Sequence, residues 1–204
     1  MGAEGYRLVT KADFDGMVCG ILLKELRSVE SVVFVHPKDI EKGEFQVTGT
    51  DILAGLPYRE GVHLAFDHYP SSAGAGGRDN LVVDLGAPST ARVIYDHYGK
   101  DKLAGIHGDI LDAVDKGCSA RLAVEDILYP TGWVLLSYLI DRRTGLEGTK
   151  SFSKSHDELL VELMEEGRRR SIWEILSLPH VQERLDLYFS CIEEYKEQIF
   201  RCSS

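Results

Sequence analysis

Two short segments combine acidic residues and a histidine in a pattern suited to metal-dependent phosphate chemistry. Asp13 and Asp15 lie in a Lys-Ala-Asp-Phe-Asp-Gly segment, and Asp67 is followed directly by His68. Asp51 supplies a further carboxylate between them. Carboxylate oxygens are the ligands that Mg²⁺ and Mn²⁺ prefer, and an imidazole adds preference for Mn²⁺ or a softer metal. These side chains would hold a divalent ion only where the fold brings them together.

Each segment also has a simpler explanation when it is taken alone. Asp15 would serve as a cap of the helix that follows it, and capping is the better explanation of that segment by itself. His68 would be a structural histidine with its hydrogen bonds satisfied. Three acidic groups that each follow an expected strand are harder to attribute to chance, and they favour one shared site.

The N-terminal half alternates strand and helix patterns. Strands are expected over 7–10, 31–35, 45–48, 62–66 and 80–83, and helices over 17–26 and 90–98. This alternation predicts an α/β fold with a mostly parallel five-stranded sheet flanked by helices. Ligands of such sheets collect beyond the carboxyl ends of the strands. The groups at Asp13/Asp15, Asp51 and Asp67/His68 are therefore expected to meet at one edge.

The C-terminal half has mainly helical patterns. Helices are expected over 106–116, 118–127, 133–140, 154–170, 171–178 and 180–200, with a loop over 142–150. We expect an α/β domain over 1–130 and a helical extension over 131–204 that packs on it or is linked to it. Trp133 and Trp173 have apolar neighbours and are expected in the core. The Ser- and Gly-rich segment 71–77 is interpreted as a flexible connector in preference to a phosphate cradle.

Composition narrows the class of protein. The chain has 204 residues, 44% of them hydrophobic, which is enough for a sizeable core. Its four cysteines lack zinc-type spacing and favour a reducing, cytoplasmic location. No signal peptide and no membrane span are expected. The net charge of −10 argues against an extended nucleic-acid surface and is compatible with metal ions placed between carboxylates and a small phosphate-containing substrate. A homodimer is left open.

Several motifs, in this order and spacing, resemble the DHH (Asp-His-His) phosphoesterase superfamily. They are the strand-Asp-x-Asp-Gly opening, the isolated Asp51 before Leu56-Pro57-Tyr58, the Phe66-Asp67-His68 block and the helix that begins at Pro88-Ser89-Thr90. The resemblance runs through most of the chain, including Pro130-Thr131-Gly132-Trp133, and is greatest to the exopolyphosphatase-related branch.

The resemblance implies a metal-dependent hydrolase of phosphoanhydride or phosphodiester bonds, acting on polyphosphate, pyrophosphate or short nucleotides. One or two Mn²⁺ (or Mg²⁺) ions would generate the attacking hydroxide and neutralise developing charge. The residues with catalytic roles would be Asp67, His68 and Tyr69. The metal ligands would be Asp13, Asp15, Asp51, Asp67 and Asp115, and the groups facing substrate phosphate would be Lys11, His68 and Arg92.

Three positions depart from the pattern of the superfamily. Lys11 stands where a histidine is common, Tyr69 replaces the second histidine of the Asp-His-His block, and Cys118 stands where an aspartate is expected. The alternative is therefore a catalytically impaired homologue that binds phosphate or nucleotide, or serves as an interaction domain. Relatives also carry a smaller C-terminal substrate-binding domain with a Gly-Gly-Gly-His motif. The sequence printed here lacks that motif, which suggests either a part of a larger protein or a minimal homologue.

Overall fold

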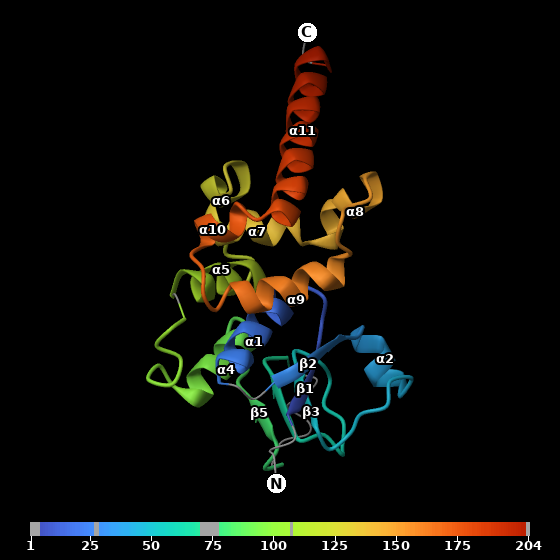
Figure 1. Cartoon of the computed structure of the whole chain (residues 1–204), viewed down its shortest axis with the longest axis vertical. Coiled ribbons are helices and arrows are strands. Elements are labelled where there is room, and N and C mark those ends of the chain that lie inside the picture. Colours follow the sequence, from blue (N-terminus) through green and yellow to red (C-terminus); the bar gives the residue numbers. More distant parts are fainter. Residues whose placement is uncertain (1–4, 27–28, 70–77, 107, 203–204) are drawn as a thin grey trace.

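Five parallel strands form a single sheet at one end of the molecule, with the helices stacked above it (Figure 1). The structure is a computed structural model and describes residues 5–26, 29–69, 78–106 and 108–202. The strands pair in the order β2-β1-β3-β4-β5. Their bounds are β1 Tyr6–Thr10, β2 Val29–Phe34, β3 Asp51–Ala54, β4 Leu64–Asp67 and β5 Leu81–Val83.

The helices lie mainly on one side of this sheet. In the described residues their bounds are α1 Phe14–Glu25, α2 Pro37–Lys42, α4 Thr90–Tyr98, α5 Gly108–Cys118, α6 Val124–Leu128, α7 Gly132–Leu139, α8 Leu146–Thr149, α9 His156–Glu166, α10 Ile172–Leu176 and α11 Pro179–Cys202, with a 3-10 turn, η1, at Arg142–Thr144. Helices α1 and α4 lie next to the sheet, α5 and α9 lie above them, and α11 extends away from the body (Figure 1). Helix α2 lies beside β2 (Figure 1).

Apolar side chains are buried on both faces of the sheet because successive residues of a strand point to opposite sides. Leu8, Ile52 and Phe66 face the large cluster that includes α1, α4 and the C-terminal helices. Val9 and Leu53 belong to a smaller cluster on the other face. Strands that are buried on both faces have nearly continuous apolar sequences, which is general for parallel sheets.

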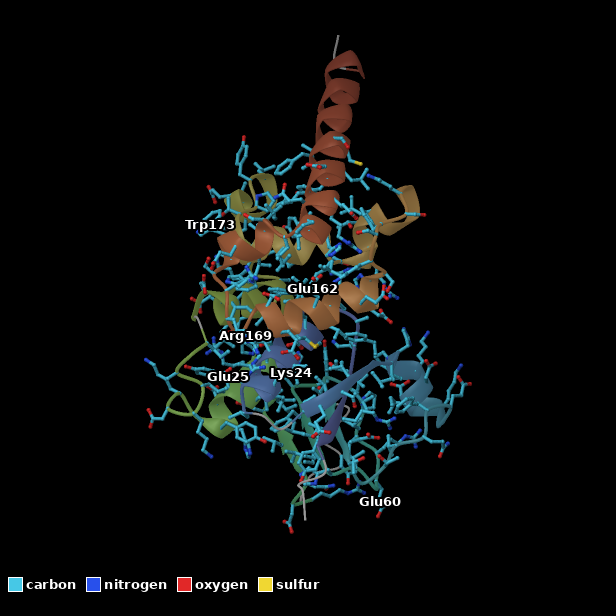
Figure 2. The ribbon with its side chains drawn as sticks, in the orientation of Figure 1. Lys24, Glu25, Glu60, Glu162, Arg169 and Trp173 are labelled. Carbon is cyan, nitrogen blue, oxygen red and sulfur yellow. The ribbon has the colours of Figure 1, made fainter. Side chains whose placement is uncertain are left out.

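Helix α9 is attached to α1 by charged contacts as well as by apolar packing. Lys24 donates to Glu165 at 2.6 Å, and Arg168 donates to Glu25 at 3.2 Å. Figure 2 shows Lys24 and Glu25 where α1 meets the helices above the sheet. Residues of α9 therefore have a fixed position relative to the loop that precedes α1.

The α/β fold with a five-stranded parallel sheet is confirmed, with local corrections. The strand expected over 45–48 is wrong, since the third strand is β3. The helix expected over 118–127 is also wrong, because α5 ends at Cys118 and Ala120 adopts a left-handed φ of 54° before α6 begins. The expected loop at 142–150 contains η1 and α8, and α2 was not expected.

The two tryptophans have different environments. Trp133 is buried as expected, whereas Trp173 has 67% of its surface exposed and lies at the periphery of the helical layers (Figure 2). The connector expected at 71–77 lies outside the described residues. Within the part of the chain that the structure describes, no helix is long and apolar enough to cross a membrane.

Candidate functional site

The strand order reverses direction between β1 and β3, which is the point where open α/β sheets have a ligand crevice at their carboxyl edge. The chain moves outward from β1 to β2, then returns to pair β3 on the other side of β1. Open α/β sheets bind ligands at such switch points, because the loops that leave the two strands diverge and leave room between them. The segment Lys11–Asp15 follows β1 here, and Gly55 follows β3.

Asp13 caps α1, and its carboxylate is also paired with a lysine. Its Oδ1 accepts a hydrogen bond from the Gly16 amide at 2.9 Å, which is the usual contact of a helix N-cap. Its Oδ2 lies 3.2 Å from Lys11 Nζ. Both oxygens of Asp13 therefore have partners within the loop.

Asp15 is buried and connects the β1 loop to the N-terminus of α4. Its two oxygens accept hydrogen bonds from the amides of Thr90 at 3.2 Å and Ala91 at 3.0 Å. Burial and the neighbouring charge of Asp13 raise the pKa of Asp15, while Lys11 and the Ala91 amide act in the opposite direction. A carboxylate at this position satisfies helix amides and complements the helix dipole.

Asp67 and His68 lie at the end of β4, on the same edge. Asp67 Oδ1 accepts hydrogen bonds from the amides of His68 at 2.8 Å and Tyr69 at 3.3 Å. His68 Nδ1 is 2.9 Å from Thr90 Oγ1, so the imidazole is oriented by the first residue of α4. The expected approach of the Asp13/Asp15 and Asp67/His68 segments is therefore found, with α4 as the element that joins them.

Lys11 lies among these groups. Its ammonium is 5.5 Å from the ring centroid of Tyr69, within the range of a cation–π contact. Burial lowers the pKa of Lys11, but the negative charges of Asp13 and Asp15 outweigh burial, so this pKa lies above its usual range. Lys11 is therefore a cation at neutral pH.

Asp51 does not lie at this edge, and the prediction that it follows a strand is wrong. It is the first residue of β3 and pairs with Arg7 at the amino end of β1, so the length of the strand separates it from the crevice. Its carboxylate accepts two hydrogen bonds from Arg7, at 2.7 and 2.8 Å, and one from the Thr48 amide at 2.8 Å. Asp51 is buried, and these contacts give it a structural role at the opposite edge.

Replacing Arg7 by methionine is expected to destabilise the fold without changing phosphate binding. Asp51 would remain buried without its counter-ion, which we expect to cost about 2–3 kcal/mol in the free energy of unfolding. Burial raises the pKa of Asp51, but Arg7 and the Thr48 amide outweigh it, so the pKa lies below its usual value. The stabilisation is thus present above the unfolded pKa of about 3.9 and is lost as the pH falls through the folded pKa.

Urea unfolding of the wild-type protein and the Arg7→Met variant between neutral and acidic pH tests this expectation. The difference in stability should shrink at acidic pH. A folded Arg7→Met protein that selectively lost phosphate binding would instead return Asp51 to the ligand site.

Asp115 and Arg92 are paired with each other. Arg92 Nε donates to Asp115 Oδ2 at 2.8 Å, and Ser89 Oγ donates to Asp115 Oδ1 at 2.6 Å. Ser89 is also the N-cap of α4, accepting from the Arg92 amide. These contacts attach α5 to the start of α4, and both oxygens of Asp115 are used in them. A ligand role for Asp115 and a phosphate-facing role for Arg92 stay predictions that this geometry does not favour.

The side chains described above at the carboxyl edge of the sheet are called the rim from here on. They are Lys11, Asp13, Asp15, Asp67, His68 and Tyr69. The donor set at the rim does not fit a divalent metal. Within the residues that the structure describes, no group of three His, Cys, Asp or Glu side chains comes close enough to hold an ion. The carboxylates of Asp13, Asp15 and Asp67 have backbone or lysine partners, as described above. Partial desolvation and the negative charges of Asp15 and Asp13 raise the pKa of the Cys118 thiol.

Three residues next to the rim were missed by sequence reasoning. Thr90 orients His68 and binds Asp15 through its amide. His156, buried on α9, is 3.1 Å through Nε2 from the carbonyl oxygen of Ala12 and holds the loop before Asp13. Gly55 has a left-handed φ of 65°, and a glycine directly after an apolar strand was the one signal available in the sequence.

A hollow of about 410 Å³ opens beside this rim. Lys11 and Asp13 line it on one side, and Phe34, His36 and Pro37 line it at the end of β2. Its lining combines charged and apolar side chains, which suits an organic molecule that carries a phosphate.

The fold and the rim together define an α/β protein with a ligand crevice at the carboxyl edge of a parallel sheet. Among solved structures, the chain is similar to the pGpG-specific phosphodiesterase PggH from Vibrio cholerae, with a TM-score of 0.86 and 42% sequence identity. The match covers 97% of this chain and 64% of that one, so this chain spans less than two thirds of the phosphodiesterase. No protein-family model and no curated protein matches the chain.

Proposed function

We propose that the chain is a DHH-type phosphoesterase that takes a small phosphodiester, such as a linear dinucleotide, at this rim. The observation that carries the proposal is the 42% identity with a pGpG-specific phosphodiesterase over 97% of the chain. The free thiols of Cys19, Cys118 and Cys191 support a cytoplasmic location.

The rim offers groups that would bind and orient a phosphate. The Lys11 ammonium carries three donors, of which the contact with Asp13 uses one. The hydrogen bond between His68 Nδ1 and Thr90 leaves Nε2 of the imidazole to face a ligand. Tyr69 is exposed and has an O–H that would donate to a phosphate oxygen. These groups supply charge and hydrogen bonds for recognition, whereas the described donors offer no complete set for a divalent ion.

The test of this function is hydrolysis of pGpG, pyrophosphate and tripolyphosphate, each with Mn²⁺ and with EDTA. The expected result is hydrolysis of the internal phosphodiester of pGpG to give two mononucleotides. Chromatography measures the mononucleotides that are released. His68→Ala should lose this activity, and Asp96→Ala, an exposed change on α4, should retain it. Wild-type protein that cleaves none of these compounds in either condition would contradict the proposal.

Phe34 is expected to contact the organic part of the substrate. It lines the hollow next to Lys11, so Phe34→Ala removes an apolar surface without removing charge. We expect about a tenfold loss of affinity for pGpG, corresponding to about 1.4 kcal/mol, with affinity for tripolyphosphate unchanged. Calorimetric titration with both compounds measures the difference, and equal losses for both would place the organic part elsewhere.

A second candidate function is binding of the same phosphodiester without turnover. It is favoured by one observation, the lysine in contact with Asp13 at the centre of the rim. In that case pGpG binds and His68→Ala weakens its binding, but no mononucleotide appears in either condition.

A further inference from the structure

The Lys11 ammonium lies beside Asp13 and Asp15, where a metal ion bound by these two carboxylates would lie. Its Nζ is 3.2 Å from Asp13 Oδ2, and the charges of both Asp13 and Asp15 act on it. The face of Tyr69 lies on the same ammonium at 5.5 Å. The ammonium thus contacts one carboxylate and an aromatic face and lies near a second carboxylate, so the cation at this acidic segment is a side chain of the protein.

The backbone at Gly55 is fitted to this lysine. A Cβ at position 55 would lie 3.3 Å from Lys11 Cε and 3.1 Å from Thr90 Oγ1, so a side chain there would compete with the lysine for space. Gly55 follows β3, the strand next to β1, and lies across the switch point from Lys11. The absence of a side chain at Gly55 therefore leaves the space that the Lys11 side chain occupies.

The Lys11 side chain is also partly exposed. Lys11 has 19% of its side-chain surface exposed and lines the hollow together with Asp13. Asp13 also lines the hollow and has 45% of its side-chain surface exposed, so a phosphate that entered would meet the Lys11 ammonium together with a carboxylate whose charge Lys11 offsets.

We infer that Lys11 is the built-in cation of this rim, which binds the phosphate of the substrate directly and excludes a divalent ion from Asp13 and Asp15. This inference rests on the proposed function for the identity of the ligand. A divalent ion at the two carboxylates would lie next to the ammonium, 3.2 Å from Asp13 Oδ2, and would be repelled by it. The rim would then recognise phosphate through the Lys11 charge, as lysines do in other phosphate sites, while Arg142, which also lines the hollow, donates to Asp157.

The inference is tested on the wild-type chain by two titrations. Electron paramagnetic resonance of free Mn²⁺ should show no stoichiometric binding to the protein. Calorimetric titration with pGpG should give the same affinity in EDTA as in Mn²⁺. Stoichiometric Mn²⁺ binding, or pGpG binding that requires Mn²⁺, would overturn the role of Lys11 and leave the proposed function standing.

The variant Lys11→Met keeps the length of the side chain and removes the charge. It should weaken pGpG binding in EDTA by about thirtyfold, the worth of one charge-assisted hydrogen bond. Lys100→Met makes the same change on an exposed residue beyond the C-terminal end of α4 and should have no effect. Unchanged binding by a folded Lys11→Met protein would overturn the inference. Absence of pGpG binding by the wild-type chain in both conditions would overturn the inference and the proposed function together.

Discussion

Replacing Asp15 by alanine is expected to lower the free energy of unfolding by about 3 kcal/mol and to weaken pGpG binding, because the segment that carries Lys11 is no longer held to α4. The carboxylate is buried and accepts the amides of Thr90 and Ala91, so its loss leaves two buried donors at the start of α4 without acceptors. For a chain of this length that change corresponds to a fall of about 6–12 °C in Tm. Thermal unfolding and calorimetric titration with pGpG measure the two effects.

The matched control is Asp96→Ala, which removes an exposed carboxylate from α4, the helix whose first amides Asp15 binds. It should leave both Tm and affinity unchanged. Asp15→Asn separates the two roles of the residue, since the amide oxygen still accepts one helix N–H while the negative charge is gone. An Asp15→Ala protein that kept wild-type Tm would show that this carboxylate does not hold the β1 loop to α4.

Replacing Gly16 by alanine is expected to have the second large effect. A Cβ at this position would lie 2.1 Å from the carbonyl oxygen of Lys11 and 2.8 Å from Thr10 Oγ1, and backbone cannot yield as a flexible side chain does. The loop that carries Lys11 and Asp13 would have to move, at a cost of about 2–4 kcal/mol. We expect a lower midpoint of urea unfolding and weaker pGpG binding.

Gly117→Ala is the corresponding control. It lies within α5, and a Cβ there would meet nothing within 4 Å. Alanine has the higher helix propensity, so this variant should be unchanged or more stable by up to about 1 kcal/mol. If Gly16→Ala behaved like Gly117→Ala, the close approach of the loop to α1 would not be required for the site.

The class of fold could be predicted from the sequence because strand and helix patterns alternate over the first hundred residues. The strand at Asp51–Ala54 was misplaced by a few residues, because alternating Phe45 and Val47 resemble a half-buried strand while β3 itself is buried throughout. The break after Cys118 was not predictable, since Ala120 is not a residue type that usually adopts a positive φ. Tertiary packing decides both cases.

The location of the site was predictable in part. Asp13, Asp15, Asp67 and His68 follow strands of one parallel sheet, and the rule that ligands gather at carboxyl ends places them together. Asp51 was assigned to the same edge because the third strand was predicted to end before Asp51, whereas β3 begins at Asp51. The use of the carboxylates was not predictable, because spacing does not reveal that Asp15 binds the amides of α4 or that Lys11 pairs with Asp13.

The central claim is that the carboxyl edge of the sheet between β1 and β3 binds a small phosphodiester. Titration of pGpG into ¹⁵N-labelled protein, followed by amide chemical shifts, tests this claim most directly. The largest shifts are expected at residues 11–16, 34–37, 54–55 and 67–69 and at the start of α4, with Arg7 and Asp51 unaffected. Shifts confined to the opposite edge, or no shifts at saturating pGpG, would contradict the account.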